Sequence, residues 1–191
     1  MRKATSKPTK KRKAAAPAKR ARTSPVAKTA PETADDPNFW LVKSEPETFS
    51  FADLLALPDR TTHWDGVRNF AARGHLRAMK KGDRVFFYHS SADPSAIVGI
   101  AEVAREAYPD HSALDSKDPH FDPKSNPDSP TWFMVDVRGI EPLPRPVSLD
   151  EIKKNKALAS MALVRLGRLS VQPVTPKEWE TVLQMSRSKP A

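Results

Sequence analysis

The run Val85-Phe86-Phe87-Tyr88 constrains the fold of this chain more than any other stretch. Successive side chains of a β-strand point to opposite faces, so four consecutive β-forming residues predict a strand that is covered on both faces. The preceding Lys81-Gly82-Asp83 is a turn sequence, which places the start of the strand at Arg84. We therefore expect a sheet with apolar packing on each side. The polar sequence Tyr88-His89-Ser90 should lie where the strand leaves the core.

Residues 1–37, here called the basic tail, cannot contribute to such a core. They contain no Leu, Ile, Phe, Trp or Tyr, so they cannot bury enough apolar surface to offset chain entropy, and we expect them to be disordered. The tail holds 11 Lys/Arg and 3 Asp/Glu, a net charge of +8 out of +9 for the whole chain. Its basic run Lys10, Lys11, Arg12 and Lys13 predicts phosphate contacts that do not read base sequence. A nuclear localisation signal is the alternative interpretation of this run.

The composition excludes several classes of site and protein. The chain has no cysteine, which rules out disulfides, thiolate zinc sites and cysteine nucleophiles. No run approaches the ~20 apolar residues of a membrane-spanning helix, and the basic start of the chain lacks the apolar segment of a secretory signal. We expect a protein that is not secreted and has no membrane partner. It should lie in the nucleus of a eukaryotic host, or otherwise in the cytoplasm or nucleoid.

Apolar spacing and helix caps predict about five strands and five short helices, with no βαβ rhythm. Gly99 inside one strand indicates a bulge, a barrel corner or a close backbone approach. This pattern favours an α+β fold, a small mixed barrel surrounded by helices, over residues 38–186, followed by a short C-terminal tail at 187–191. The expected strands cover residues 39–43, 84–89, 96–105, 132–140 and 168–174, with a loop over 106–130. The expected helices begin after Ser50, Ser148 and Thr175, and two more lie near 70–80 and 157–164.

Neither metal binding nor catalysis is favoured by the motifs. None of the five histidines lies four residues from another or in a His-x-His pair, so we predict no metal site and no cofactor. There is no Gly-x-Ser-x-Gly elbow and no Walker loop, and the best isolated carboxylates, Glu45 and Asp65, form no recognisable pair. We therefore do not expect an enzyme.

Aromatic and hydrogen-bonding residues offer a better explanation of function. Trp40, Trp64 and Trp132 each lie at a predicted element boundary, with polar side chains nearby. An aromatic wall with a few directed polar groups suits a flat heterocycle, which stacks on its face and hydrogen-bonds along its edge. Taken singly, each tryptophan is better explained as a core residue.

Five motifs in this order resemble the EVE domain family, over about residues 38–186. The motifs are Trp40-Leu41-Val42-Lys43-Ser44-Glu45-Pro46, Trp64-Asp65-Gly66-Val67-Arg68-Asn69, Phe87-Tyr88-His89-Ser90, Glu106-Ala107-Tyr108-Pro109-Asp110 and Arg168-Leu169-Ser170-Val171-Gln172-Pro173. The resemblance implies a PUA-like pseudo-barrel related to YTH and ASCH domains. It also implies a reader of modified bases, with C5-modified cytosine (5-methyl or 5-hydroxymethyl) in DNA as the expected target. Many relatives carry Tyr-Gln where this chain has Phe70-Ala71, which removes a hydroxyl and an amide.

By the same resemblance, a base pocket and a phosphate-contacting set can be named. The base pocket would consist of Ser44, Trp64, Asn69, Tyr88, His89 and Ser90, and the phosphate contacts of the domain would come from Lys43, Arg68 and Arg168. We thus predict a monomeric, non-enzymatic nucleic-acid reader that prefers DNA to RNA. The alternatives are an RNA-binding PUA-type module, a nucleic-acid-acting enzyme that uses Glu45 or Asp65, and a chromatin-packing protein that binds through the tail alone.

Overall fold

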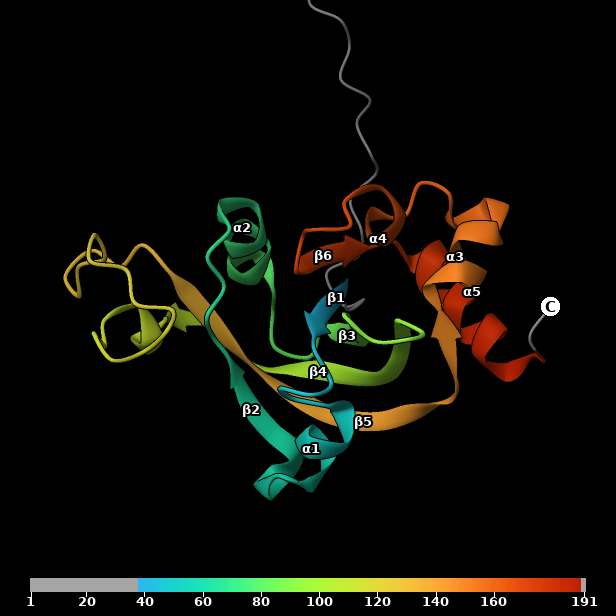
Figure 1. Ribbon diagram of the computed structural model, residues 1–191, viewed down its shortest axis with the longest axis horizontal. Helices are drawn as coiled ribbons and strands as arrows, with labels where there is room; N and C mark the ends of the chain where they lie inside the picture. Colours follow the sequence, from blue (N-terminus) through green and yellow to red (C-terminus); the bar gives the residue numbers. More distant parts are fainter. Residues whose placement is uncertain (1–37, 190–191) are drawn as a thin grey trace, which may run out of the picture. The chain divides into compact units, whose positions relative to one another are not determined.

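A six-stranded mixed sheet forms the centre of the computed structural model, which describes residues 38–189 (Figure 1). The strands are β1 (Phe39–Ser44), β2 (Thr61–Trp64), β3 (Arg84–His89), β4 (Ala96–Pro109), β5 (Phe133–Ser148) and β6 (Val171–Val174). Their order is β2-β5-β4-β3-β1-β6, and β1 with β3 is the parallel pair. The helices are α1 (Phe51–Ala56), α2 (Phe70–Ala78), α3 (Leu149–Lys154), α4 (Ala162–Arg165) and α5 (Pro176–Arg187), with 3-10 turns η1 (Pro58–Arg60), η2 (His111–Ala113) and η3 (Lys156–Leu158).

The central strand β3 is covered on both faces, as its sequence predicts. Val85 and Phe87 belong to one core, which packs against α1 and α2. Phe86 and Tyr88 belong to a second core on the opposite face, formed with α3, η3, α4 and α5. In the second core the ring of Phe86 stacks on Trp179, with 3.7 Å between the centroids.

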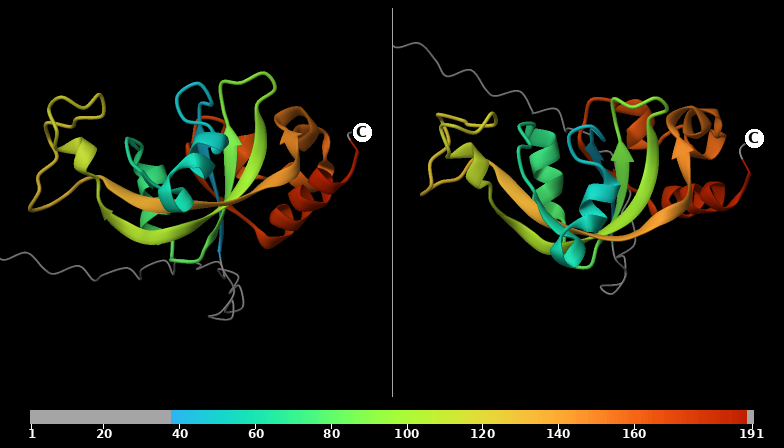
Figure 2. Two further views of the ribbon diagram at one scale, coloured as in Figure 1. Left: turned by 90° about the horizontal axis from the view of Figure 1, so that it is seen from below. Right: turned by 60° about the horizontal axis from the view of Figure 1, so that its bottom comes forward.

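The expected α+β class is confirmed, and the sheet is open. Each of its edge strands, β2 and β6, pairs with one neighbour only, so the strands do not close into a barrel. The long strands β4 and β5 instead form a curved ribbon (Figure 2). Four register shifts interrupt their pairing, and such irregularities bend a strand and increase its twist.

Three helix starts confirm the predicted caps. Ser50, Ser148 and Thr175 each form a reciprocal capping box with the acidic residue three positions later. The last of these helices, α5, continues through Arg187, into the segment where a C-terminal tail was expected. None of the helices within residues 38–189 is long and apolar enough to cross a membrane.

The largest corrections to the expected strands concern β2, β4 and β5, and β6 begins at Val171 and not at residue 168. β2 was not expected at all, because Thr61-Thr62-His63 shows no apolar alternation. β4 runs on to Pro109 into the expected loop, and β5 continues to Ser148 past three prolines. β2 pairs only with Val135–Arg138, so beyond Gly139 β5 has a single partner, and prolines are tolerated on an unpaired strand edge. The predictions for the basic tail lie outside the described residues.

Gly99 marks a close approach between β4 and α1. A Cβ atom added there would overlap the ring of Phe51, whose Cδ1 atom would lie only 2.6 Å away. That ring is buried against Phe87, with centroids 5.2 Å apart, so it cannot swing aside freely. The absence of a side chain at Gly99 is therefore required for α1 to pack on the sheet.

We expect Gly99→Ala to lower the free energy of unfolding by about 1–3 kcal/mol, as overpacking of a filled core does. Chemical denaturation monitored by circular dichroism measures the change. Gly74→Ala is the matched control, because Gly74 lies in α2 with nothing within 4 Å of an added Cβ. That substitution should stabilise the domain by up to about 1 kcal/mol. Equal effects of the two substitutions would contradict the steric explanation.

Candidate nucleic-acid interface

A hollow of about 420 Å³ opens beside the C-terminal ends of β1 and β2. This volume is within the range of small-ligand pockets. Its lining consists of Lys43, Ser44, Thr48, Phe49, Thr62, His63, Trp64, Asp65, Gly66, Val67, Arg68, His120 and Ser170. The lining therefore comes from four separate segments, which the curved sheet and the 110–132 loop bring together.

Trp64 supplies the aromatic wall of the hollow. It is the last residue of β2, and its ring packs edge-on against Phe87 of β3, with the centroids 5.5 Å apart and the planes at 87°. The packing fixes the plane of the indole, which is 8% exposed. Trp64 belongs to the same core as Phe87, so the part of its side chain that lines the hollow is held in place before any ligand binds.

Lys43 and Ser44 form the part of the hollow contributed by β1. The Ser44 hydroxyl donates to the Phe49 carbonyl at 2.7 Å, and the Lys43 ammonium donates to the Gly167 carbonyl at 2.7 Å. Burial lowers the pKa of Lys43 below its usual value of 10.5. Where the ammonium is charged, partial desolvation makes it interact more strongly with a phosphate than it would in open water.

Arg68 and Asp110 fix the opposite side of the hollow. The Arg68 guanidinium donates to Asp110 Oδ2 at 2.7 Å, to the His120 carbonyl at 2.7 Å and to Ser112 Oγ at 2.9 Å. Asp110 is 2% exposed and also accepts from the Gly66 amide at 3.0 Å. Burial alone would raise the pKa of Asp110, but the hydrogen bonds from Ser112 and Arg68 outweigh it and hold the pKa below 3.8.

The predicted site residues divide into three groups. The structure brings Ser44 and Trp64 into the hollow together with Lys43 and Arg68 from the phosphate-contacting set. Asn69 and Arg168 line a second depression, and Asn69 caps α2 by accepting from the amides of residues 71 and 72. Arg68 lines the hollow and Asn69 lines the second depression, so the two depressions adjoin at these consecutive residues.

The third group, Tyr88, His89 and Ser90, does not line the hollow. Tyr88 is 3% exposed and belongs to the core on the other face of the sheet. His89 Nε2 accepts from the Phe51 amide at 3.0 Å, so this nitrogen is an acceptor at the start of α1. Desolvation lowers the His89 pKa. The Ser90 amide donates to the Ser44 carbonyl at 2.8 Å. This bond holds the backbone of Ser44, which lines the hollow.

Sequence reasoning missed other lining residues, including Thr48, Thr62, His63 and His120. These residues belong to turns, to the unexpected strand β2 and to the acidic loop, where no periodic pattern distinguishes them. The buried position of Asp110 was missed as well, because this residue lies in the segment that the sequence predicts to be a loop. Glu45, one carboxylate of the enzymatic alternative, accepts from the Ser91 hydroxyl at 2.9 Å and is not part of the lining.

An EVE domain family model matches residues 38–185 of the chain. The chain belongs to the EVE domain family. The EVE domain described here is similar to thymocyte nuclear protein 1 of Rattus norvegicus, at 46% identity over 171 residues that cover 81% of this chain and 76% of the rat protein. The resemblance inferred from the five motifs is confirmed.

Solved structures share the fold of this EVE domain. One is the crystal structure of the human THYN1 protein in complex with 5-methylcytosine-containing DNA, with a TM-score of 0.77 and 42% identity over 80% of this chain and 99% of that one. Another is a Pseudomonas putida protein, with a TM-score of 0.74 and 44% identity over 78% of this chain and 99% of that one.

Proposed function

We propose that this EVE domain is a reader of DNA that carries a C5-modified cytosine, 5-methylcytosine in the first instance. The observation that carries the proposal is the human structure bound to 5-methylcytosine-containing DNA, which matches this chain over nearly all of its own length. The hollow beside Trp64 is the place we assign to the modified base, since it combines an aromatic wall with polar groups on its other sides.

The hollow and the basic tail would contribute to DNA binding in different ways. Extruding a base from a duplex costs a few kcal/mol, and stacking on an aromatic side chain returns about 1–3 kcal/mol per base. Residues 38–191 hold 21 Lys/Arg and 20 Asp/Glu, so the domain attracts phosphates only modestly. The basic tail, at +8, would supply a salt-dependent attraction that does not depend on base identity.

Titration of the full chain with matched oligonucleotides tests the proposal. Duplexes that differ only in one 5-methylcytosine should bind with different affinity, the methylated one more tightly. An RNA of the same sequence should compete more weakly than the DNA. Equal affinity for methylated and unmethylated DNA would overturn base-specific reading, and stronger competition by the RNA would favour the RNA-binding alternative.

Lys43 is proposed as a phosphate contact at the edge of the hollow. Lys43→Met should weaken binding of methylated and unmethylated DNA alike, and should reduce the slope of log K against log salt by about 0.9, the value for one phosphate contact. Lys177→Met is the matched control, because Lys177 is exposed on α5, which packs in the second core. An unchanged salt slope for Lys43→Met, or the same loss for both variants, would count against the contact.

The remaining parts of the proposal concern catalysis, assembly and location. A binding role without catalysis is supported by the position of Glu45 outside the hollow and by the hydrogen bonds that occupy the Asp110 carboxylate, so that Asp65 is the one carboxylate among the described lining residues. We propose that the domain acts as a monomer and that, in a eukaryotic host, the protein resides in the nucleus, in keeping with the name of its vertebrate relatives. Incubation with modified nucleotides should yield no product.

A further inference from the structure

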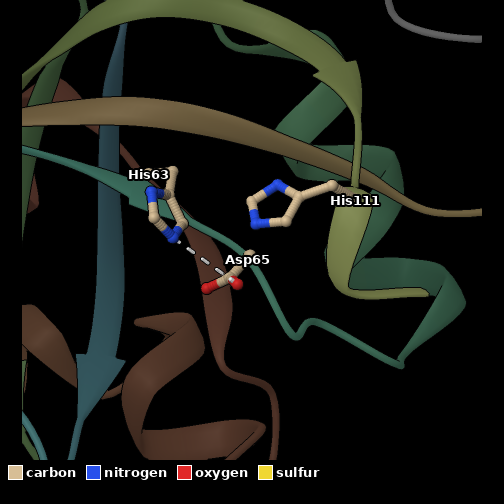
Figure 3. Close-up of side chains that lie close together, drawn as sticks. All are labelled: His63, Asp65 and His111. Carbon is tan, nitrogen blue, oxygen red and sulfur yellow. Dashed lines mark ion pairs between the residues drawn. The ribbon is translucent and has the colours of Figure 1, made fainter. Parts of the chain in front are cut away.

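Three side chains with metal-ligating atoms lie close together (Figure 3), and two of them, His63 and Asp65, also line the hollow. His63 and Asp65 come from β2 and the residue after its end, and His111 begins η2. One ligand atom from each lies within 4.8 Å of the other two. His63 Nε2 is 3.7 Å from Asp65 Oδ2, and the two imidazole centroids are 5.1 Å apart. Spacing along the sequence could not indicate this cluster, because the fold brings β2 and the 110–132 loop together.

The backbone holds the three side chains in place. His63 and Asp65 are two residues apart on an extended segment, so their side chains project from the same side. His63 is fixed opposite Asp136 of β5 in the sheet register. Asp110, directly before His111, accepts from the amide of Gly66, directly after Asp65, at 3.0 Å. This bond fastens the two ligand-bearing segments to each other one residue away from the ligands.

We propose that His63, Asp65 and His111 bind a zinc ion. Two imidazoles and one carboxylate form an established three-ligand set for Zn²⁺, with a solvent molecule in the fourth position. Imidazole nitrogen favours zinc over the oxygen-seeking Mg²⁺ and Ca²⁺. The side chains of His63 and Asp65 are 50% and 32% exposed, so an ion can reach them and small rotations can draw the ligand atoms together.

A zinc ion at this position would change the electrostatics of the hollow. His63 and Asp65 both line it, so the ion would add positive charge beside the proposed base site, in a domain that is otherwise nearly neutral. The metal site itself does not depend on the proposed function, since zinc binding is measured without nucleic acid.

Isothermal titration of the full chain with ZnCl₂, in a buffer that does not chelate, tests the site. We expect saturable binding of about one equivalent, and no binding of MgCl₂ under the same conditions. His63→Ala and His111→Ala should each weaken zinc binding about tenfold or more, because each removes one of three protein ligands. His120→Ala is the control. It removes an imidazole that lines the hollow but lies outside the cluster, and it should bind zinc like the unaltered chain.

Thermal melts provide a second readout that does not depend on the titration. Zinc should raise the Tm of the unaltered chain and of His120→Ala, and should leave the Tm of His111→Ala unchanged. Without zinc the three proteins should melt at similar temperatures, since His111 and His120 are both exposed. Absence of saturable binding would overturn the proposal. So would unchanged affinity in His111→Ala, or an equal loss in His120→Ala.

Discussion

Trp64→Leu should weaken binding of 5-methylcytosine DNA by about 1–3 kcal/mol, which is about five- to 150-fold in Kd. Leucine keeps much of the apolar volume against Phe87 but removes the flat aromatic face that we assign to the base. The preference for methylated over unmethylated DNA should shrink along with the affinity. Fluorescence anisotropy with matched labelled duplexes measures both quantities.

The matched control for this experiment is Trp179→Leu. Trp179 is also a buried tryptophan that packs on a phenylalanine of β3, but it lies in the core on the opposite face of the sheet. The control should lose stability through the gap left in its core and still prefer methylated DNA as the unaltered chain does. If both substitutions reduce the preference equally, Trp64 acts through the fold and is not the wall of the base site.

Asp110→Ala should lower the free energy of unfolding by about 3 kcal/mol. The substitution removes the acceptor of the Gly66 amide, of the Ser112 amide and hydroxyl, and of the Arg68 guanidinium. Removing one partner of a buried ion pair leaves the charge of the other uncompensated, which costs about 3–5 kcal/mol. Because the Arg68 side chain keeps partial exposure, we expect a cost at the lower end of this range. Urea denaturation monitored by circular dichroism measures the loss.

The pH dependence of stability should change in the same variant. The folded-state pKa of Asp110 lies below its ordinary value of 3.8, so its stabilising contribution is fully present above that value and is lost as the pH falls through the folded pKa. Asp110→Ala should therefore lose less stability than the unaltered chain when the pH falls from about 5 towards 2. Asp128→Ala, an exposed aspartate in the same loop, should alter neither stability nor its pH profile. If Asp110→Ala lost as much stability at low pH as the unaltered chain does, the role assigned to this carboxylate would be contradicted.

Local signals in the sequence predicted the centre of the fold well. The run through Val85 and Phe87 identified a strand buried on both faces, and serine and threonine caps located three helices, because these features depend on neighbouring residues alone. β2 escaped prediction because it is a short edge strand. Its pairing with β5 determines its conformation, and its own side chains give no alternation.

The candidate site was harder to predict, because proximity in a motif does not determine which face a side chain occupies. Tyr88 follows Phe87 in the strand, so alternation turns its side chain to the opposite core from the face on which Phe87 meets Trp64. His89 was expected at a base edge, yet its acceptor nitrogen is occupied by the Phe51 amide. The contacts of Asp110 depend on a loop that joins segments distant in sequence, and no local pattern encodes them.

Photo-crosslinking of the full chain to a DNA duplex with one 5-iodocytosine tests the central claim most directly. The iodine occupies the position of the methyl group and couples on irradiation to an adjacent aromatic side chain. Digestion with trypsin and mass spectrometry then identify the peptide that carries the base. We expect the crosslink in the peptide of residues 61–68, which contains Trp64. Crosslinks confined to the basic tail or to α5, with none in residues 61–68, would contradict the claim.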